Sequence, residues 1–202
     1  MYRLITNYFH GFVLAITIIS YCGSCASLSD KYLHEIEEKT PLHAPQANKE
    51  YMFENATSYV GNRIVVDSTE NRPYKYDMLW RNFEPKFDID GVDWIDYQVK
   101  IEIVSDKKFK AKLLSSSGEI IKERTLKYDR VGSFFKIKPK FWFWNNYILV
   151  NGFESQISAF SLSEKDDLVL VKRSVDGAFF IVIPFGGSET SDVYHYKLIF
   201  VR

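Results

Sequence analysis

The densest group of possible metal ligands in this 202-residue chain lies between Asp88 and Asp93, where aspartates alternate with apolar residues and Gly91. Oxygen-rich loops that contain glycine suit calcium. A helix–loop–helix calcium site would need a third ligand at position 92, a glycine at 93 and a glutamate at 99, but these positions hold Val92, Asp93 and Val99. An ordinary acidic loop before a strand explains the cluster better. We therefore predict no metal and no cofactor.

Nucleophilic hydrolysis would need a general base within reach of a serine, threonine or cysteine. His195 is the only histidine between residues 53 and 202, and it lies in the alternating run VYHYKLIFV. A structural or solvent-facing histidine is typical of such a position. The chain also lacks a G-x-S-x-G sequence and a glycine-rich phosphate loop. We expect a non-enzymatic protein, and an envelope hydrolase that uses His195 is the rival hypothesis.

An aromatic stretch, KIKPKFWFWNNY, extends from Lys136 to Tyr147 and combines lysines with Phe141, Trp142, Phe143 and Trp144. Aromatic faces stack on sugars and apolar ligands, and tryptophan favours boundaries between wet and dry regions. Alternatively, the phenylalanines are core residues and the tryptophans cover a neighbouring element. If the protein has an internal pocket, we expect four aromatic residues to line it: Tyr97, Trp142, Trp144 and Tyr196.

The first 24 residues are predicted to be an export signal. Arg3 is their only charged side chain, and a short apolar core, FVLAITIIS, follows from Phe12 to Ser20. This core is shorter than the roughly 20 apolar residues of a membrane span. Gly23 and Ser24 then stand directly before Cys25, which resembles the lipobox of bacterial lipoproteins. The resemblance implies that Cys25 is acylated and becomes the new N-terminus, although Cys22 stands where leucine is commonest in that motif.

The anchor has alternatives and consequences. Cleavage after Ala26 would give a secreted or periplasmic protein, and an uncleaved anchor is a further possibility. Both cysteines lie in this segment, so the mature fold is predicted to contain no disulfide. Ala26 and Ser27 follow the cysteine without an aspartate, which in a double-membrane bacterium predicts an outer-membrane location. Residues 25–52 are polar, contain Pro41 and Pro45, and are predicted to be a tether with a brief helical signal at 30–38.

Composition sets limits on the domain at residues 53–202. The whole chain is 46% hydrophobic and 16% aromatic, which is ample for a packed core. It carries 26 basic and 26 acidic residues, so no strong field attracts nucleic acid. We therefore expect no nucleic-acid partner.

The stretch WIDYQVKIEIV, from Trp94 to Val104, shows the clearest pattern in the chain. Ile95, Tyr97, Val99, Ile101 and Ile103 alternate with polar residues, and a period of two sends these sets to opposite faces of a β-strand. A strand with one dry face needs further strands to close over the same core.

Together with this central strand, the chain predicts nine to ten short strands joined mostly by tight turns. A short helix is expected near residues 76–83, where Met78, Leu79 and Phe83 share a face. Asn145-Asn146 is a plausible turn, and Asp176-Gly177 gives the strongest hairpin signal. Residues 185–192, FGGSETSD, are expected to form a flexible loop.

These patterns predict an all-β protein, either an antiparallel up-and-down barrel or a two-sheet sandwich. The layout of residues 55–202 resembles the lipocalin-like (calycin-like) domains of small bacterial lipoproteins, although Gly61 is followed two positions later by Arg63 rather than tryptophan. We expect a membrane-tethered envelope protein that binds an apolar or amphipathic small molecule or an envelope partner. The alternative is a structural or protein-interaction lipoprotein with a filled core.

Overall fold

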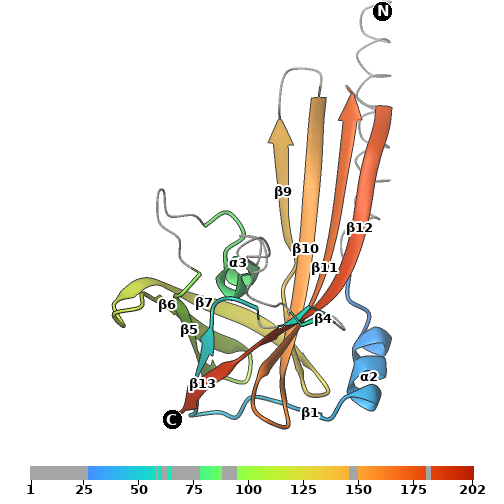
Figure 1. Ribbon diagram of the computed structural model, residues 1–202. Helices are drawn as coiled ribbons and strands as arrows, with labels where there is room; N and C mark the ends of the chain where they lie inside the picture. Colours follow the sequence, from blue (N-terminus) through green and yellow to red (C-terminus); the bar gives the residue numbers. More distant parts are fainter. Residues whose placement is uncertain are drawn as a thin grey trace, which may run out of the picture. The chain divides into compact units, whose positions relative to one another are not determined.

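The computed structural model describes residues 27–57, 59–60, 63–64, 78–87, 95–145, 150–180 and 183–202 (Figure 1). These residues belong to two compact units. The core unit comprises residues 28–138, 158–172 and 191–202. The described residues of the strand unit are Ser27 and residues 139–145, 150–157, 173–180 and 183–190. Each unit is considered by itself.

The described elements are two helices and a series of strands. The helices are α2 (Asp30–Lys39) and α3 (Leu79–Phe83). The strands of the first half are β1 (Leu42–His43), β2 (Glu50–Glu54), β3 (Tyr59–Val60), β4 (Arg63–Ile64), β5 (Gln98–Ser105) and β6 (Lys108–Leu114). The strands of the second half are β7 (Ile120–Val131), β8 (Phe134–Ile137), β9 (Lys140–Asn145), β10 (Val150–Ser163), β11 (Leu168–Phe180), β12 (Ile183–Tyr196) and β13 (Leu198–Val201).

All these strands form one sheet, and every pairing whose register the structure defines is antiparallel. The main order is β13-β2-β5-β6-β7-β8-β10-β11-β12-β3-β4, with β1 and β9 also paired to β10. In the core unit the sheet is strongly curled, as in a half-barrel. The prediction of an all-β antiparallel fold, either a barrel or a sandwich, is confirmed as one large curled sheet that forms a half-barrel. The predicted count of nine to ten strands is low because several strands are only two residues long.

The predicted central strand is confirmed as β5. Val99, Ile101 and Ile103 are buried, whereas the residues between them are partly exposed. β5 pairs with β2 on one side, where Tyr51 lies opposite Ile101, and with β6 on the other, where Ala111 lies opposite the same residue. Two-residue alternation therefore gives all three strands a shared dry face.

The segment predicted as a tether contains folded elements. α2 begins after Ser29, whose Oγ accepts a hydrogen bond from Tyr32 N at 3.2 Å, as an N-cap does. Leu33 on this helix and Leu28 before it are almost fully buried. β1 then pairs with β10, and β2 contributes Tyr51 and Phe53 to the core. Buried leucines and a capped helix explain why these residues pack in the core unit.

α2 is held to the turn between β7 and β8 by Glu37. Its Oε1 accepts a hydrogen bond from Ser133 N at 3.0 Å, and Gly132 before it has a φ of +57°. A Cβ at Gly132 would lie 2.3 Å from Glu37 Oε2, so glycine permits this close approach. Burial raises the pKa of Glu37, but hydrogen bonds from Ser133 and His34 outweigh it and hold the pKa below its ordinary value.

The predicted short helix is confirmed as α3, and Met78, Leu79, Trp80 and Phe83 are all buried. Met78, at its N-cap, makes no side-chain cap hydrogen bond. Asn55 caps the helix instead, because its backbone O accepts from Leu79 N at 2.8 Å and its Oδ1 accepts from Trp80 N at 3.0 Å. This buried residue thereby satisfies two free amides of the helix.

The prediction of a hairpin at Asp176-Gly177 is wrong. Both residues lie inside β11, and φ of Gly177 is outside the left-handed region that a type I′ turn requires. The reason for a glycine here is space. A Cβ on Gly177 would lie 2.5 Å from Cε1 of Phe153 on β10, whose ring stacks on Phe141 of β9 with centroids 5.8 Å apart.

The loop predicted at residues 185–192 is also wrong, since these residues belong to β12. Polar side chains link this part of β12 to β11. Arg173 Nη2 forms an ion pair with Glu189 Oε1 at 2.6 Å, and Ser188 Oγ donates to Asp176 Oδ1. The glycines and serine suggested a loop, but pairing with a long neighbouring strand gives the segment an extended conformation.

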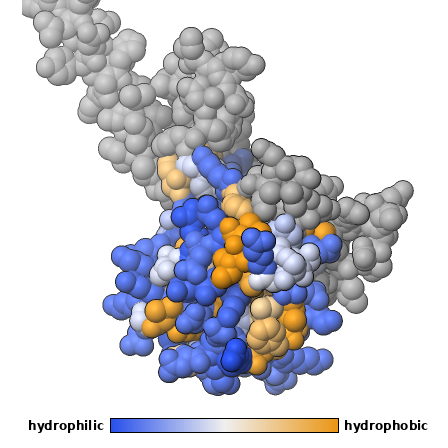
Figure 2. Space-filling view, turned by 90° about the vertical axis from the view of Figure 1, so that its left-hand side faces the viewer, coloured by the Kyte–Doolittle hydropathy of each residue, from blue (hydrophilic) through white to orange (hydrophobic). Residues whose placement is uncertain are grey.

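β12 and β13 are separated only by Lys197, and β13 pairs with β2. The register of this pair shifts between Leu198 and Phe200, so the pairing is irregular there. Leu198 N donates to Oδ1 of Asp167 at 2.9 Å. Ile199 and Phe200 are exposed, by 42% and 40%. Figure 2 shows hydrophobic patches of limited extent among mainly hydrophilic residues on the face it presents.

Candidate functional site

Aromatic rings pack against one another in the interior of the core unit. Phe83 on α3 contacts Phe109 with ring centroids 5.5 Å apart, and Phe109 contacts Phe160 at 5.1 Å. Phe160 in turn contacts Phe135 at 5.5 Å, and Phe135 stacks on Tyr128 at 4.1 Å. None of these side chains exposes more than 3% of its surface. Rings from α3, β6, β10, β8 and β7 thus occupy this part of the interior at ordinary contact distances.

The four predicted lining residues lie in different environments. Tyr196 on β12 is fully buried in the core, where its OH accepts from Asn82 Nδ2 at 3.5 Å, and Tyr97 packs partly buried against the same core. Trp142 lies on β9 in the strand unit, and its Nε1 donates to Glu154 Oε2 at 3.1 Å. The backbone of Trp144 pairs with Gly152, and its side chain lies outside the described residues. The structure thus brings Tyr97 and Tyr196 to one core.

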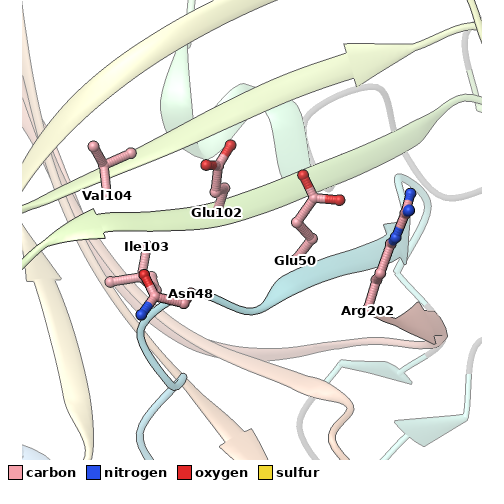
Figure 3. A pocket seen from close by; sticks show the side chains of 6 residues that line it. All are labelled: Asn48, Glu50, Glu102, Ile103, Val104 and Arg202. Carbon is pink, nitrogen blue, oxygen red and sulfur yellow. The ribbon is translucent and has the colours of Figure 1, made fainter.

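A surface pocket of about 520 Å³ is present on the core unit (Figure 3). It is lined by Asn48, Glu50, Glu102, Ile103, Val104 and Arg202. Glu50 and Glu102 lie directly opposite each other on β2 and β5, which is unfavourable for two carboxylates. Lys100 relieves this by an ion pair of 2.6 Å with Glu50, and the hydrogen bond from Lys100 is the main reason why the pKa of Glu50 is lowered. Lys100 already supplies the cation that Glu50 would otherwise attract.

His195 lies on β12 in the core unit. Burial lowers the pKa of its imidazole and outweighs the opposing effect of Asp167, which favours the neutral form of the ring. Thr57 Oγ1 donates a hydrogen bond of 3.0 Å to the backbone O of His195. This hydrogen bond joins two chain segments that are 138 residues apart in the sequence.

Within the described residues, no three histidine, cysteine, aspartate or glutamate side chains form a group that could hold a metal ion. The acidic cluster at residues 88–93 lies outside the described residues. Two other histidines each have a carboxylate neighbour: His34 Nδ1 lies 3.3 Å from Glu37 Oε2, and His43 Nε2 lies 3.0 Å from Asp166 Oδ1.

Cys25, the predicted acylation site, lies outside the described residues, but Ser27 does not. The carbonyl oxygen of Ser27 accepts a hydrogen bond of 2.6 Å from Nη1 of Arg173 on β11.

Comparisons with protein families, curated proteins and solved structures gave no match. In the described part of the chain, no helix has the length and hydrophobicity needed to cross a bilayer. Function is therefore inferred from the residues themselves.

Arg173 and Asn55 are positioning residues that sequence reasoning missed. Arg173 holds Ser27, 146 residues earlier in the chain, and Asn55 caps a helix 25 residues away. Neither contact follows a local motif, so no pattern in the sequence identifies it.

Proposed function

We propose that this protein is an exported, non-enzymatic lipoprotein of the bacterial cell envelope that acts through its surface on a protein partner. In this proposal Cys25 carries the lipid anchor, and in a double-membrane organism the protein resides at the outer membrane. We further propose that the curled sheet is a lipocalin-like domain with a filled core.

The contacts among Phe83, Phe109, Phe160 and Phe135 are the observation that supports a surface function best. An apolar ligand in the interior would have to displace these rings, and each displaced contact would offset part of the binding free energy. The other candidate, a carrier of an apolar small molecule, requires an interior with room beside Tyr97 and Tyr196.

Two measurements test the proposal. Cells that produce the wild-type protein or Cys25→Ala are grown with a clickable fatty acid, and we expect label only in the wild type. Absence of label would instead favour secretion. Native mass spectrometry of the purified protein is expected to show the acylated polypeptide alone. An apolar small molecule bound in stoichiometric amount would overturn the filled-core proposal and favour the carrier.

A further inference from the structure

A row of charged side chains from neighbouring strands crosses the surface pocket of the core unit (Figure 3). Glu50 on β2 exchanges two backbone hydrogen bonds, of 3.0 and 2.9 Å, with Arg202, which directly follows β13. On its other side Glu50 lies directly opposite Glu102 on β5. Residues that face each other in an antiparallel sheet point their side chains to the same face. The pocket therefore receives two carboxylates and one guanidinium from adjacent strands.

The middle carboxylate of this row, that of Glu50, is already compensated. Lys100 on β5 forms an ion pair of 2.6 Å with it, and the hydrogen bond from Lys100 is the main cause of the lowered pKa of Glu50. Burial opposes this effect, and the charge of Arg202 lowers the pKa further, which places the guanidinium within electrostatic range of the carboxylate. A ligand therefore has no need to supply a cation to Glu50.

The two outer charges of the row keep their capacity to bind a ligand. Among the described residues, neither the Glu102 carboxylate nor the Arg202 guanidinium forms an ion pair. Lys110 lies directly opposite Glu102 on β6, but its Nζ lies 3.6 Å from Oε1 of Glu123. Neighbouring strands are about 4.8 Å apart, so the backbones of Glu102 and Arg202 are about 10 Å apart. The pocket thus offers one negative and one positive group at this separation.

The remaining lining and the charge balance limit the ligand further. Val104 is 52% exposed and provides apolar surface, and Asn48 provides a neutral amide. The volume of about 520 Å³ is in the usual range of small-molecule sites. The charges of the two carboxylates, Lys100 and Arg202 sum to zero. A small molecule with one positive group, one negative group and no net charge is therefore complementary to the pocket.

We propose that this pocket binds a short peptide with free ends, with its ammonium group at Glu102 and its carboxylate at Arg202. An extended dipeptide spans about 7 Å and can reach both side chains, whereas a free amino acid carries both charges on one carbon and reaches only one. The site lies on the surface and goes beyond the proposed anchor and partner surface. Each charge contact is partly exposed and contributes up to about fivefold in affinity, so we expect a Kd on the order of millimolar.

The test measures peptide binding to the full chain in detergent micelles by saturation-transfer NMR, which observes weakly bound ligands. The probes are glycylglycine, N-acetylglycylglycine, which lacks the ammonium group, and glycylglycinamide, which lacks the carboxylate. At pH 7 we expect glycylglycine to bind about fivefold more tightly than either of the others. Glu102→Gln should weaken glycylglycine about fivefold and leave N-acetylglycylglycine unchanged. Arg202→Gln should likewise weaken glycylglycine and leave glycylglycinamide unchanged.

Glu54→Gln is the matched control for the change in net charge. Glu54 lies on the same face of β2 as Glu50, about 13 Å farther along the strand, and does not line the pocket. This variant should bind glycylglycine like the wild type. Absence of saturation transfer to glycylglycine, or equal affinity for the three peptides, would overturn the proposal. A loss in Glu54→Gln equal to that in Glu102→Gln would also overturn it, as would a pocket variant that weakens all three peptides alike.

Discussion

Replacing Gly177 by alanine tests the packing of the strand unit most directly. The added Cβ would lie 2.5 Å from Cε1 and 2.9 Å from Cζ of Phe153, both closer than carbon atoms approach in folded proteins. The Phe153 ring must move, and it is already stacked on Phe141 with an angle of 20° between the ring planes. Overpacking of this kind costs about 1–3 kcal/mol of unfolding free energy.

A double-mutant cycle identifies the cause. Phe153→Leu removes the two ring atoms that the new Cβ would meet, so Gly177→Ala should cost much less in that background, with a coupling of about 0.5–3 kcal/mol. Gly118→Ala is the control, because Gly118 has a φ of +83° and no atom lies within 4 Å of the position that its new methyl group would take. Its cost comes from backbone conformation and should be the same with or without Phe153.

The assay is chemical denaturation followed by tryptophan fluorescence, with thermal unfolding as a second measure. For a chain of this size, each kcal/mol of lost unfolding free energy lowers the midpoint of thermal unfolding by about 2–4 °C. Additive effects of Gly177→Ala and Phe153→Leu would refute the contact. Such a result would favour a turn at Gly177, where alanine is unfavourable whatever residue occupies position 153.

Three further predictions concern the core unit. Phe160→Ala should cost about 3–5 kcal/mol in denaturant unfolding, and a loss below about 1 kcal/mol would contradict a filled interior. Asn55→Ala should cost about 1–3 kcal/mol by leaving Trp80 N without its acceptor, whereas Asn55→Asp keeps an acceptor and should recover part of the loss. Glu37→Gln should destabilise the protein above about pH 5 and much less below the folded pKa of Glu37. The reason is that a carboxylate whose pKa falls below its ordinary 4.5 on folding stabilises the fold only while it is ionised. A difference in unfolding free energy between the two proteins that persists unchanged to pH 2 would contradict this prediction.

The sequence predicted those elements whose residues alternate or repeat with the period of a strand or helix. The alternation around Val99 and Ile101 identified β5, and the spacing of Leu79 and Phe83 identified α3. β10 shows the limit, because residues 157–162 are buried without alternation and include two serines. A strand covered on both faces has no period of two, so its length could not be read from hydrophobicity.

The misread glycine shows a second limit. Gly177 follows an aspartate, and that pair favours a turn wherever the chain is free to choose. Here the glycine is required by Phe153 on a different strand, because its ring occupies the space that a side chain at position 177 would fill. The predicted pocket could not be tested from the sequence for the same reason. Whether Tyr97 and Tyr196 border a cavity or other side chains depends on residues that are distant in the sequence.

Asp167 and the register shift in β13 together have a consequence for behaviour at high protein concentration. A short apolar strand at the margin of a sheet, such as LIFV, offers its amides to any extended peptide that approaches. Here the backbone N–H of Leu198 already donates to the carboxylate of Asp167. The register shift before Phe200 also means that the remaining backbone amides of β13 do not match the spacing of a regular strand. We therefore expect β13 to resist open-ended association with further strands, although Ile199 and Phe200 are exposed to water.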